Sequence, residues 1–258
     1  MNNKIKKIMN KKKKSKIICL TAYSKNIAEI IDNHTDIVLV GDSLGSVLYN
    51  YSTTRKVDLK MMIEHTKSVR MGVKKSLLVI DLPYKTYRNK SEALKNSKKV
   101  IKETKCDAVK IEGGVKVKNI VRHLVKNNIP VLGHIGITPQ TVKGKFTTKG
   151  KSEIEKKKLI KDAKALEASG AFAIVLECIY SDISKKISQL IKIPTIGIGA
   201  SVNCDGQVLV TDDIIGLTNA KIKFVKKYAN IKKIINSAVV KFKQEVKTKK
   251  YPSKKYSY

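Results

Sequence analysis

Short apolar runs recur along this sequence, and each is followed by a stretch in which apolar residues have helical spacing. Many of these runs are rich in β-branched residues and end in Gly or Asp. Eight runs can be counted, at residues 17–23, 37–41, 77–82, 108–111, 130–133, 173–176, 194–198 and 207–210. Runs that are apolar at nearly every position are typical of parallel strands covered on both faces. Eight such strands alternating with helices predict an α/β fold of the TIM (β/α)₈-barrel type.

The segments between the runs each show one apolar face. Ser91 is the expected N-cap of one of these helices. Its apolar face is formed by Ala93, Leu94, Ser97, Val100 and Ile101. The main alternative to a barrel is a doubly wound open sheet, but no GxGxxG motif follows the first run to support it.

The length of 258 residues suits one sizeable core, so we expect a single barrel domain over residues 1–258. A basic N-terminal extension of about residues 1–15 precedes the first run, and a Lys-rich helical segment of about residues 217–258 follows the last. We expect this C-terminal segment to lie over the surface or over a neighbouring subunit. The basic N-terminus lacks the long apolar stretch and cleavage site of a secretory signal. No run approaches a membrane span, so the sequence predicts a cytoplasmic protein without membrane attachment.

The formal net charge of +33 raises the possibility of a nucleic-acid-binding protein. Only four of the 54 basic residues are Arg, however, and the lysines are spread over the whole chain. Because bidentate Arg is the preferred reader of phosphates and bases, we interpret the charge as solvated lysine faces and expect no specific nucleic-acid partner. A basic protein with an inert barrel stays the non-enzyme alternative. The four cysteines are too far apart for a zinc site and indicate reduced thiols.

Polar residues directly follow several of the apolar runs. In a barrel, the chemistry lies at the C-terminal ends of the strands, where such residues converge. They are Asp42 and Ser43 after the second run, Asp81 in the third, Lys110 in the fourth and Glu112 directly after it, His134 after the fifth and Glu177 after the sixth. An all-oxygen cluster of acids without nearby thiolates favours Mg²⁺ over zinc.

Each of these residues also has a structural interpretation. Asp42 could cap the next helix, and Lys110 could form an ion pair with Glu112, since residues two apart in a strand point to the same face. His134 could bond to a backbone carbonyl. Taken together, the acids, the lysine and the histidine are more than structure requires, because buried charges are unfavourable without compensation.

With these residues in view, the sequence resembles the ketopantoate hydroxymethyltransferase family from about residue 16 to the C-terminus. The matching motifs are LTAY at 20–23, VGDSLG at 40–45, DLPY at 81–84, VKIEGG at 109–114, GHIGITPQ at 133–140, LEC at 176–178, IGIGA at 196–200 and DGQVLV at 205–210. The resemblance implies a TIM barrel, Mg²⁺, and α-ketoisovalerate and methylenetetrahydrofolate as substrates. It further implies a role in pantothenate and coenzyme A synthesis and a homo-oligomer, commonly a decamer.

The resemblance also implies roles for individual residues. Asp42, Asp81 and Glu112 match the family's metal-site acids. The residues that match keto-acid contacts are Asp42, Ser43, Asp81 and Lys110. Glu177 matches the proposed proton acceptor, which makes it the expected catalytic base.

The sequence departs from the family pattern in several places. Ser24 stands where Asp is usual, Arg55-Lys56 replaces a Leu-Pro pair, and Ser201 replaces a Gly. The segment 141–150 is slightly short and has Gly144, Lys145 and Phe146 in place of Gly-Gly-Tyr. None of these departures removes an expected metal or base position.

A second enzyme hypothesis is a barrel of the phosphoenolpyruvate mutase and isocitrate lyase type, which also acts on Mg²⁺-bound keto acids. Turnover of oxaloacetate, phosphonopyruvate or isocitrate without any turnover of α-ketoisovalerate would favour it. For the nucleic-acid alternative, binding to heparin that disappears at moderate salt, together with full transferase activity, would mark the charge as incidental.

Overall fold

The computed structural model describes residues 2–142 and 147–258. Compactness divides the chain into two units, Met1–Val210 and Thr211–Tyr258. The single domain expected from the sequence, with boundaries near residues 15 and 217, stays a prediction.

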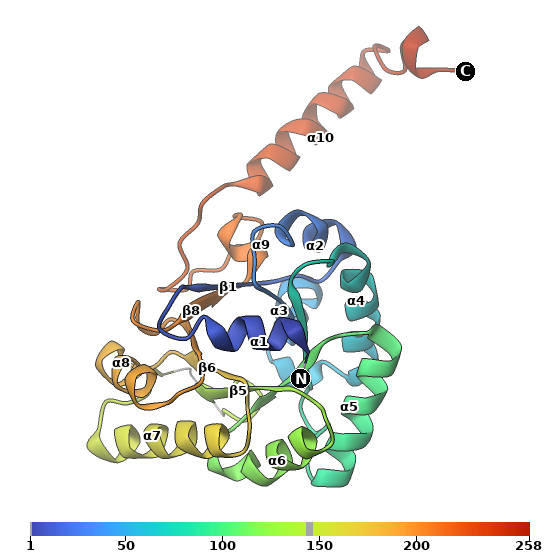
Figure 1. Cartoon of the computed structure of the whole chain (residues 1–258). Helices are drawn as coiled ribbons and strands as arrows, with labels where there is room; N and C mark the ends of the chain where they lie inside the picture. Colours follow the sequence, from blue (N-terminus) through green and yellow to red (C-terminus); the bar gives the residue numbers. More distant parts are fainter. Residues whose placement is uncertain (1, 143–146) are drawn as a thin grey trace. The chain divides into compact units, whose positions relative to one another are not determined.

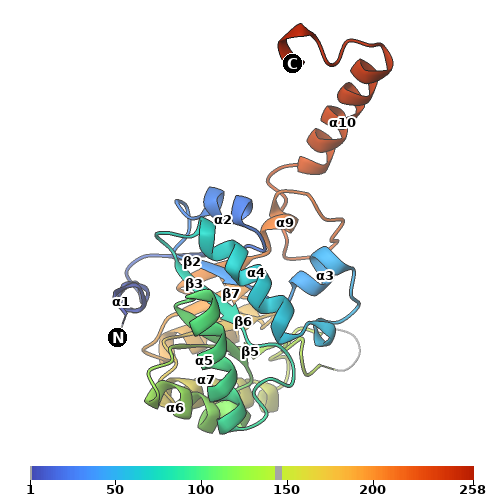
Figure 2. The same cartoon turned by 90° about the vertical axis from the view of Figure 1, so that its right-hand side faces the viewer.

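The first unit is a closed barrel of eight parallel strands in the order β1 to β8, surrounded by helices (Figures 1 and 2). The strands are β1 (Ile17–Thr21), β2 (Ile37–Val40), β3 (Leu77–Asp81), β4 (Ala108–Glu112), β5 (Val131–Gly136), β6 (Ala173–Glu177), β7 (Thr195–Ile198) and β8 (Gly206–Leu209). Every apolar run of the sequence overlaps one of these strands, so the predicted TIM barrel is confirmed.

The helices of the first unit are α1 (Asn3–Asn10), α2 (Lys25–Ile31), α3 (Leu44–Tyr49), α4 (Leu59–Gly72), α5 (Lys90–Thr104), α6 (Lys118–Lys126), α7 (Glu153–Ala168) and α8 (Ser181–Leu190), with the 3₁₀ turns η1 (Thr54–Lys56) and η2 (Val115–Val117). The second unit contains α9 (Thr211–Ile214), α10 (Ile231–Lys247) and η3 (Lys254–Tyr256). No helix among the described residues is both long and apolar enough to cross a membrane.

The N-cap expected at Ser91 is wrong. Asn89 caps α5 instead, and its side chain accepts a hydrogen bond from the backbone N–H of Glu92. Ser91 therefore lies inside the first turn of the helix. The apolar face of this helix is confirmed, because Ala93, Ser97 and Val100 are all buried.

Successive side chains along each strand point to opposite faces of the sheet, and they form two separate apolar cores. One set of side chains fills the interior of the barrel, while the other set packs against the surrounding helices. In β3, for example, Leu77 and Val79 belong to the interior and Leu78 and Ile80 to the outer layer. The short helix α1 lies at one end of the barrel (Figures 1 and 2), where its buried Ile5 and Ile8 join the interior core.

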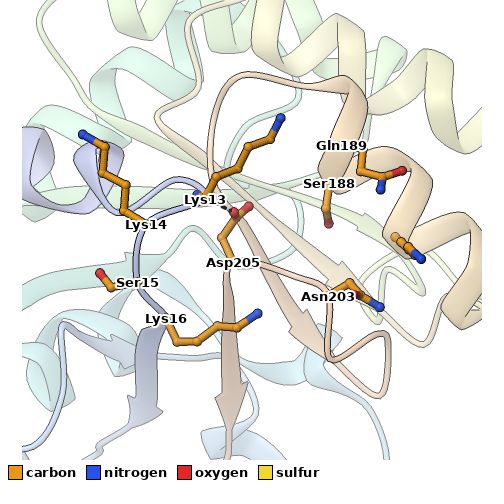
Figure 3. A pocket seen from close by; sticks show the side chains of 9 residues that line it. Lys13, Lys14, Ser15, Lys16, Ser188, Gln189, Asn203 and Asp205 are labelled. Carbon is orange, nitrogen blue, oxygen red and sulfur yellow. Dashed lines mark hydrogen bonds between the residues drawn. The ribbon is translucent and has the colours of Figure 1, made fainter.

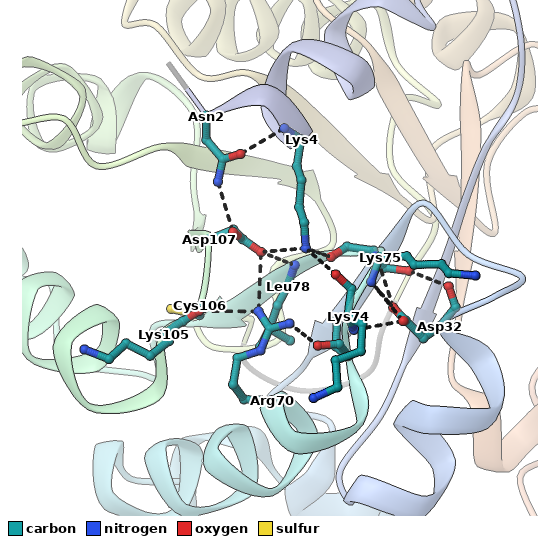
Figure 4. Close-up of polar contacts among 12 residues, drawn as sticks. Asn2, Lys4, Asp32, Arg70, Lys74, Lys75, Leu78, Lys105, Cys106 and Asp107 are labelled. Atoms are coloured by element: carbon teal, nitrogen blue, oxygen red, sulfur yellow. Dashed lines mark hydrogen bonds and ion pairs between the residues drawn. The ribbon is translucent and has the colours of Figure 1, made fainter.

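Carboxylates at the N-terminal ends of the strands bind neighbouring strands together. Asp205 lies directly before β8, close to Lys13 (Figure 3). Its carboxylate accepts hydrogen bonds from the backbone N–H of Thr195 and of Lys13 and from Nζ of Lys12. Asp107, directly before β4, accepts one from the N–H of Leu78 in β3 (Figure 4). Each carboxylate thereby satisfies N–H groups at the start of a strand and holds that end of the barrel together.

Candidate active site

The inward-facing positions of four neighbouring strands become polar at their C-terminal ends. In β3, the alternation that places Leu77 and Val79 in the interior places Asp81 on the same face. By the same alternation, Lys110 and Glu112 follow Ala108 in β4, and Glu177 follows Val175 in β6. His134 follows Leu132 in β5. Strand alternation therefore brings these side chains to one rim of the barrel.

Asp81 connects Asp42 to Lys110. Nζ of Lys110 donates a hydrogen bond to Oδ1 of Asp81 at 2.8 Å, and the backbone N–H of Asp42 donates to Oδ2 of Asp81 at 3.1 Å. All three residues are buried. The alternative prediction that Lys110 forms an ion pair with Glu112 is therefore wrong, because its ion-pair partner is Asp81.

Gln140 joins the acids at this rim, although the sequence analysis did not assign it to the site. Its Nε2 donates a hydrogen bond to Oδ2 of Asp42 at 2.8 Å, and its backbone N–H donates to Oε2 of Glu112 at 3.0 Å. The hydroxyl of Tyr87 donates to Oε1 of Gln140 at 2.6 Å. The side chain of Asp42 therefore accepts a hydrogen bond from Gln140. The alternative that Asp42 caps the next helix is wrong, because the N-cap residue of α3 is Ser43. The only sequence signal for Gln140 was its place at the end of the GHIGITPQ motif.

Arg55 holds the backbone around Gln140. Its Nε donates a hydrogen bond to the carbonyl of Gln140 at 2.8 Å, and its Nη2 donates to the carbonyl of Val142 at 3.0 Å. The guanidinium also lies over the ring of Tyr84, 5.3 Å from its centroid. This departure from the family pattern therefore supports the loop that carries Gln140.

His134 lies between two carboxylates. Its Nδ1 is 3.6 Å from Oε1 of Glu112, and its Nε2 is 3.1 Å from Oε2 of Glu177. Neither ring nitrogen has a hydrogen bond of acceptable geometry among the described residues, so the expected bond to a backbone carbonyl is not formed there. Burial and Lys110 lower the pKa of His134, but the two carboxylates outweigh them and raise it to about 9. His134 is therefore an imidazolium at neutral pH.

Glu177 lies at the edge of the buried cluster, with 21% of its side chain exposed. Gly136 of β5 makes room for it: a Cβ at this glycine would lie 2.1 Å from the carbonyl oxygen of Glu177, and its φ of +102° disfavours other residues. Glu177 therefore combines contact with the buried histidine and access to a ligand entering from the open end.

The cluster carries more negative charge than its cations balance. Burial, together with the neighbouring Asp81 and Glu112, raises the pKa of Asp42 to about 8, although Lys110 and Gln140 act in the opposite direction. Burial lowers the pKa of Lys110, but the attraction of Asp81, Glu112 and Asp42 is larger and raises it. The lysine is therefore permanently charged, while the acids repel one another.

This electrostatic imbalance fits a divalent cation. The donors at the centre of the cluster are carboxylate oxygens, which Mg²⁺ prefers, and a 2+ charge would relieve their repulsion. In the described part of the chain, no three His, Cys, Asp or Glu residues form a ready-made metal cage.

Ser43 and two of the departures have defined surroundings. The hydroxyl of Ser43, which makes no capping bond to α3, lies 2.8 Å from that of Tyr23. Ser24 is the N-cap residue of α2 but likewise makes no side-chain capping bond. Ser201 is buried and accepts a hydrogen bond from the hydroxyl of Ser181. Within the altered segment 141–150, residues 143–146, including Gly144, Lys145 and Phe146, lie outside the described residues.

Comparison with known proteins identifies relatives over the full length. The sequence profile described as ketopantoate hydroxymethyltransferase matches residues 2–254. A 3-methyl-2-oxobutanoate hydroxymethyltransferase of Pelagibacter ubique is 61% identical over 258 residues, which cover 100% of both chains. One of Rhizobium etli is 45% identical over 246 residues, which cover 94% of this chain and 90% of the relative.

Solved structures with the same fold are more distant. A 2,3-dimethylmalate lyase of the phosphoenolpyruvate mutase and isocitrate lyase superfamily superposes with a TM-score of 0.62 at 11% identity, covering 99% of this chain and 93% of the other. A phosphonopyruvate hydrolase solved with oxalate and Mg²⁺ has a TM-score of 0.60 at 12% identity, with the same coverage. At this identity the likeness extends to the fold alone.

Proposed function

Since this chain belongs to the ketopantoate hydroxymethyltransferase family, we propose that it transfers the one-carbon unit of methylenetetrahydrofolate to α-ketoisovalerate by Mg²⁺-assisted enolate chemistry. The chain is an enzyme, a transferase of the pantothenate pathway. The observation that carries the finer proposal is the buried rim cluster of Asp42, Asp81, Lys110 and Glu112, with Glu177 at its edge. The second enzyme hypothesis matches this chain only in fold.

The proposed metal site consists of Asp42 and Asp81, with Glu112 contributing directly or through water. Mg²⁺ bound there would supply Lewis-acid stabilisation of the negative charge that develops on the keto oxygen. Support comes from the surroundings of Asp42, whose pKa is raised to about 8 first by burial and then by the neighbouring Asp81 and Glu112. The phosphonopyruvate hydrolase with bound oxalate and Mg²⁺ has the same fold and holds a two-carbon diacid that resembles the head of a keto acid.

Lys110 and Ser43 are the proposed contacts to the keto acid, together with Asp42 and Asp81. The Lys110 ammonium is held by Asp81 at 2.8 Å and stays charged at all physiological pH values, so it can attract the substrate's carboxylate and keto oxygens. The Ser43 hydroxyl can reorient from Tyr23 to donate to the substrate. Both groups are in place before substrate arrives, which avoids reorganisation during the reaction.

Glu177 is the proposed base that removes the C3 proton of α-ketoisovalerate. The resulting carbanion equivalent at C3 forms the new bond to the folate-borne carbon. Over the whole reaction both bonds of that carbon to nitrogen break, one being replaced by the bond to C3 and the other by the hydroxyl of one water. The C3 proton and the remaining proton of the water go to the two nitrogens, and tetrahydrofolate leaves. His134, whose Nε2 lies 3.1 Å from Oε2 of Glu177, pairs with the carboxylate and holds it in place. The partial exposure of Glu177 gives the substrate access to it.

The test separates proton removal from carbon transfer. Exchange of the C3 hydrogen of α-ketoisovalerate into deuterated water is followed by NMR with Mg²⁺ and without folate. We expect the wild-type protein to exchange and Glu177→Gln to lose about 10²–10⁴-fold of that rate while still binding the keto acid, because an amide accepts no proton. Ketopantoate formation with the complete set of substrates checks the overall reaction. Undiminished exchange in Glu177→Gln would contradict the assignment and transfer the base role to the neutral form of His134 or to a metal-bound water.

The assembly and the location of the enzyme belong to the same proposal. We expect a homo-oligomer, specifically a decamer, that acts in the cytoplasm, where its folate and keto-acid substrates occur. Light scattering coupled to size-exclusion chromatography measures the assembly directly. A monomer at micromolar concentration would contradict it.

A further inference from the structure

The turn η1 holds the backbone of Arg55 in a fixed place. The side chain of Thr53 accepts a hydrogen bond from the backbone N–H of Arg55 at 3.3 Å. Val57, which directly follows the turn, is buried and packs so closely on Gly45 that a Cβ at this glycine would lie 2.5 Å from its Cγ2. Gly45 belongs to α3, the helix that begins just after Asp42. The segment that carries Arg55 is therefore anchored beside the candidate active site.

The guanidinium of Arg55 directs its positive charge at two backbone carbonyls. It donates to the carbonyls of Gln140 and Val142 at 2.8 and 3.0 Å, and among the described residues no carboxylate lies within ion-pair distance of it. Both carbonyls belong to one turn, in which the N–H groups of Thr141 and Val142 donate to the carbonyl of Thr138. A planar fork of donors can hold two carbonyls at a fixed spacing, whereas a lysine ammonium is a point charge on a flexible stem. Arg55 therefore fixes the conformation of this turn.

Gln140 transmits this constraint to two of the proposed metal-site acids. Its backbone N–H donates to Glu112 at 3.0 Å, and its side-chain amide donates to Asp42 at 2.8 Å. The same amide nitrogen donates to the carbonyl of Leu82 at 3.0 Å, and the amide oxygen accepts from the hydroxyl of Tyr87. The amide is thus held at both of its ends, and the residue is buried. A shift of the backbone at Gln140 would therefore disturb both carboxylates at once.

We propose that Arg55 is a positioning residue for the Mg²⁺ site, because the turn that it fixes holds Asp42 and Glu112 at the spacing that the cation requires. The inference rests on the proposed function, since it takes these two acids as metal-site residues. Arg55 itself acts only through Gln140. The family pattern has a Leu-Pro pair where this chain has Arg55 and Lys56, so that pattern supplies no guanidinium at this position.

A role through charge and a role through positioning predict opposite changes in Mg²⁺ affinity. If Arg55 acted only through its charge, removing a cation near the acids would strengthen Mg²⁺ binding, because less positive charge would repel the metal. If Arg55 positions the acids, its removal loosens the turn around Gln140 and weakens Mg²⁺ binding. The sign of the change therefore separates the two roles.

The neighbouring Lys56 offers a matched control. It lies in the same turn η1, is exposed, and has its Nζ 5.6 Å from the centroid of the Tyr51 ring. Lys56→Gln removes one positive charge next to Arg55 but leaves both hydrogen bonds of the guanidinium in place. It therefore measures the effect of the charge alone.

The experiment measures Mg²⁺ binding to the full-length protein by isothermal titration calorimetry without substrates. For Arg55→Gln we expect a Kd for Mg²⁺ about 10-fold above that of the wild-type protein, as is typical when a residue that orients metal ligands is removed. Arg55→Lys should show most of the same loss, because it keeps the charge without the fork. It also carries the test if Arg55→Gln does not fold. Lys56→Gln should bind Mg²⁺ as tightly as the wild-type protein or slightly more tightly.

Two further measurements separate positioning from a general loss of structure. Hydrogen–deuterium exchange of the metal-free protein should be faster in Arg55→Gln for the peptide that contains Gln140, with exchange in the strands of the barrel unchanged. In steady-state assays, Arg55→Gln should need more Mg²⁺ for half-maximal rate, while saturating Mg²⁺ should restore kcat. The reason is that Lys110 and Glu177, the proposed substrate contact and base, are unchanged.

Three outcomes would overturn the inference. They are unchanged or tighter Mg²⁺ binding in Arg55→Gln, wild-type affinity in Arg55→Lys, and an equal loss in Lys56→Gln. In each of these, Mg²⁺-dependent C3 exchange by the wild-type protein would leave the proposed function standing. If the wild-type protein neither bound Mg²⁺ nor exchanged the C3 hydrogen, the proposed function would be contradicted, and this inference with it.

Discussion

The two ends of the barrel use their carboxylates in opposite ways. At the N-terminal ends of the strands, Asp107 and Asp205 accept backbone N–H groups and lie beside lysines or arginines. At the C-terminal ends, Asp42, Asp81 and Glu112 lie close to one another with Lys110 as the cation among them.

The pKa shifts follow this difference. Burial raises the pKa of Asp205, but Lys12 and the N–H groups of Thr195 and Lys13 outweigh burial and lower it. Burial and neighbouring acids raise the pKa of Asp42 to about 8. An aspartate at the N-terminal ends of the strands therefore stabilises the fold, whereas the ionised form of Asp42 at the C-terminal ends destabilises it. This arrangement is expected when the residues at the C-terminal ends bind a ligand.

The largest expected effect is on activity, and it comes from changing a carboxylate at the C-terminal ends of the strands. Asp81→Asn removes the charge that holds Lys110 and that we propose to bind Mg²⁺, so kcat/KM should fall by about 10³-fold. Isothermal titration calorimetry should show that Mg²⁺ and α-ketoisovalerate binding weaken together. Asp205→Asn is the control, and its kcat should equal that of the wild-type protein wherever it is folded. Unchanged Mg²⁺ affinity and activity in Asp81→Asn would show that the metal site lies elsewhere.

The next effect is on stability at the N-terminal end. Asp205→Ala leaves Lys12 without its partner at 2.7 Å and the N–H of Thr195 without an acceptor. Breaking a buried, hydrogen-bonded ion pair should lower the free energy of unfolding by about 3 kcal/mol. Urea denaturation followed by circular dichroism measures this change. If the free energy of unfolding fell by less than about 0.5 kcal/mol, the ion pair of Asp205 would stabilise the fold no more than an exposed ion pair does.

The smallest effect has the opposite sign. Asp42→Asn should raise the free energy of unfolding by roughly 1–3 kcal/mol at pH 8 without Mg²⁺, because it removes an unfavourable buried charge. The folded-state pKa of Asp42 is above its unfolded value of about 3.9, so ionisation destabilises the fold as pH rises between these two values. The gain should therefore be absent near pH 4 and largest near pH 8. Denaturation curves at both pH values measure this change in the free energy of unfolding. A variant less stable than the wild-type protein at pH 8 would show that the ionised Asp42 does not destabilise the fold.

Local pattern in the sequence was sufficient for the barrel and for most of the rim. Apolar runs separated by helical segments predicted eight parallel strands, and the structure contains each of them. The places of Asp81, Glu112 and Glu177 at the ends of apolar runs also predicted that they lie at one rim of the barrel. Both signals depend only on neighbouring residues and are therefore readable without a fold.

Tertiary structure alone decided which of these polar groups meet. Lys110 pairs with Asp81 of the adjacent strand, whereas the sequence offered the nearby Glu112 as its partner. Gln140 reaches Asp42 from a loop, and Arg55 supports that loop from another part of the chain. Loops carry no periodic signal, and a contact between distant segments depends on barrel closure and on the register of neighbouring strands. The sequence by itself therefore determined the strands and the residues at their ends, while the closed barrel determined their partners and, with them, the charges that they carry.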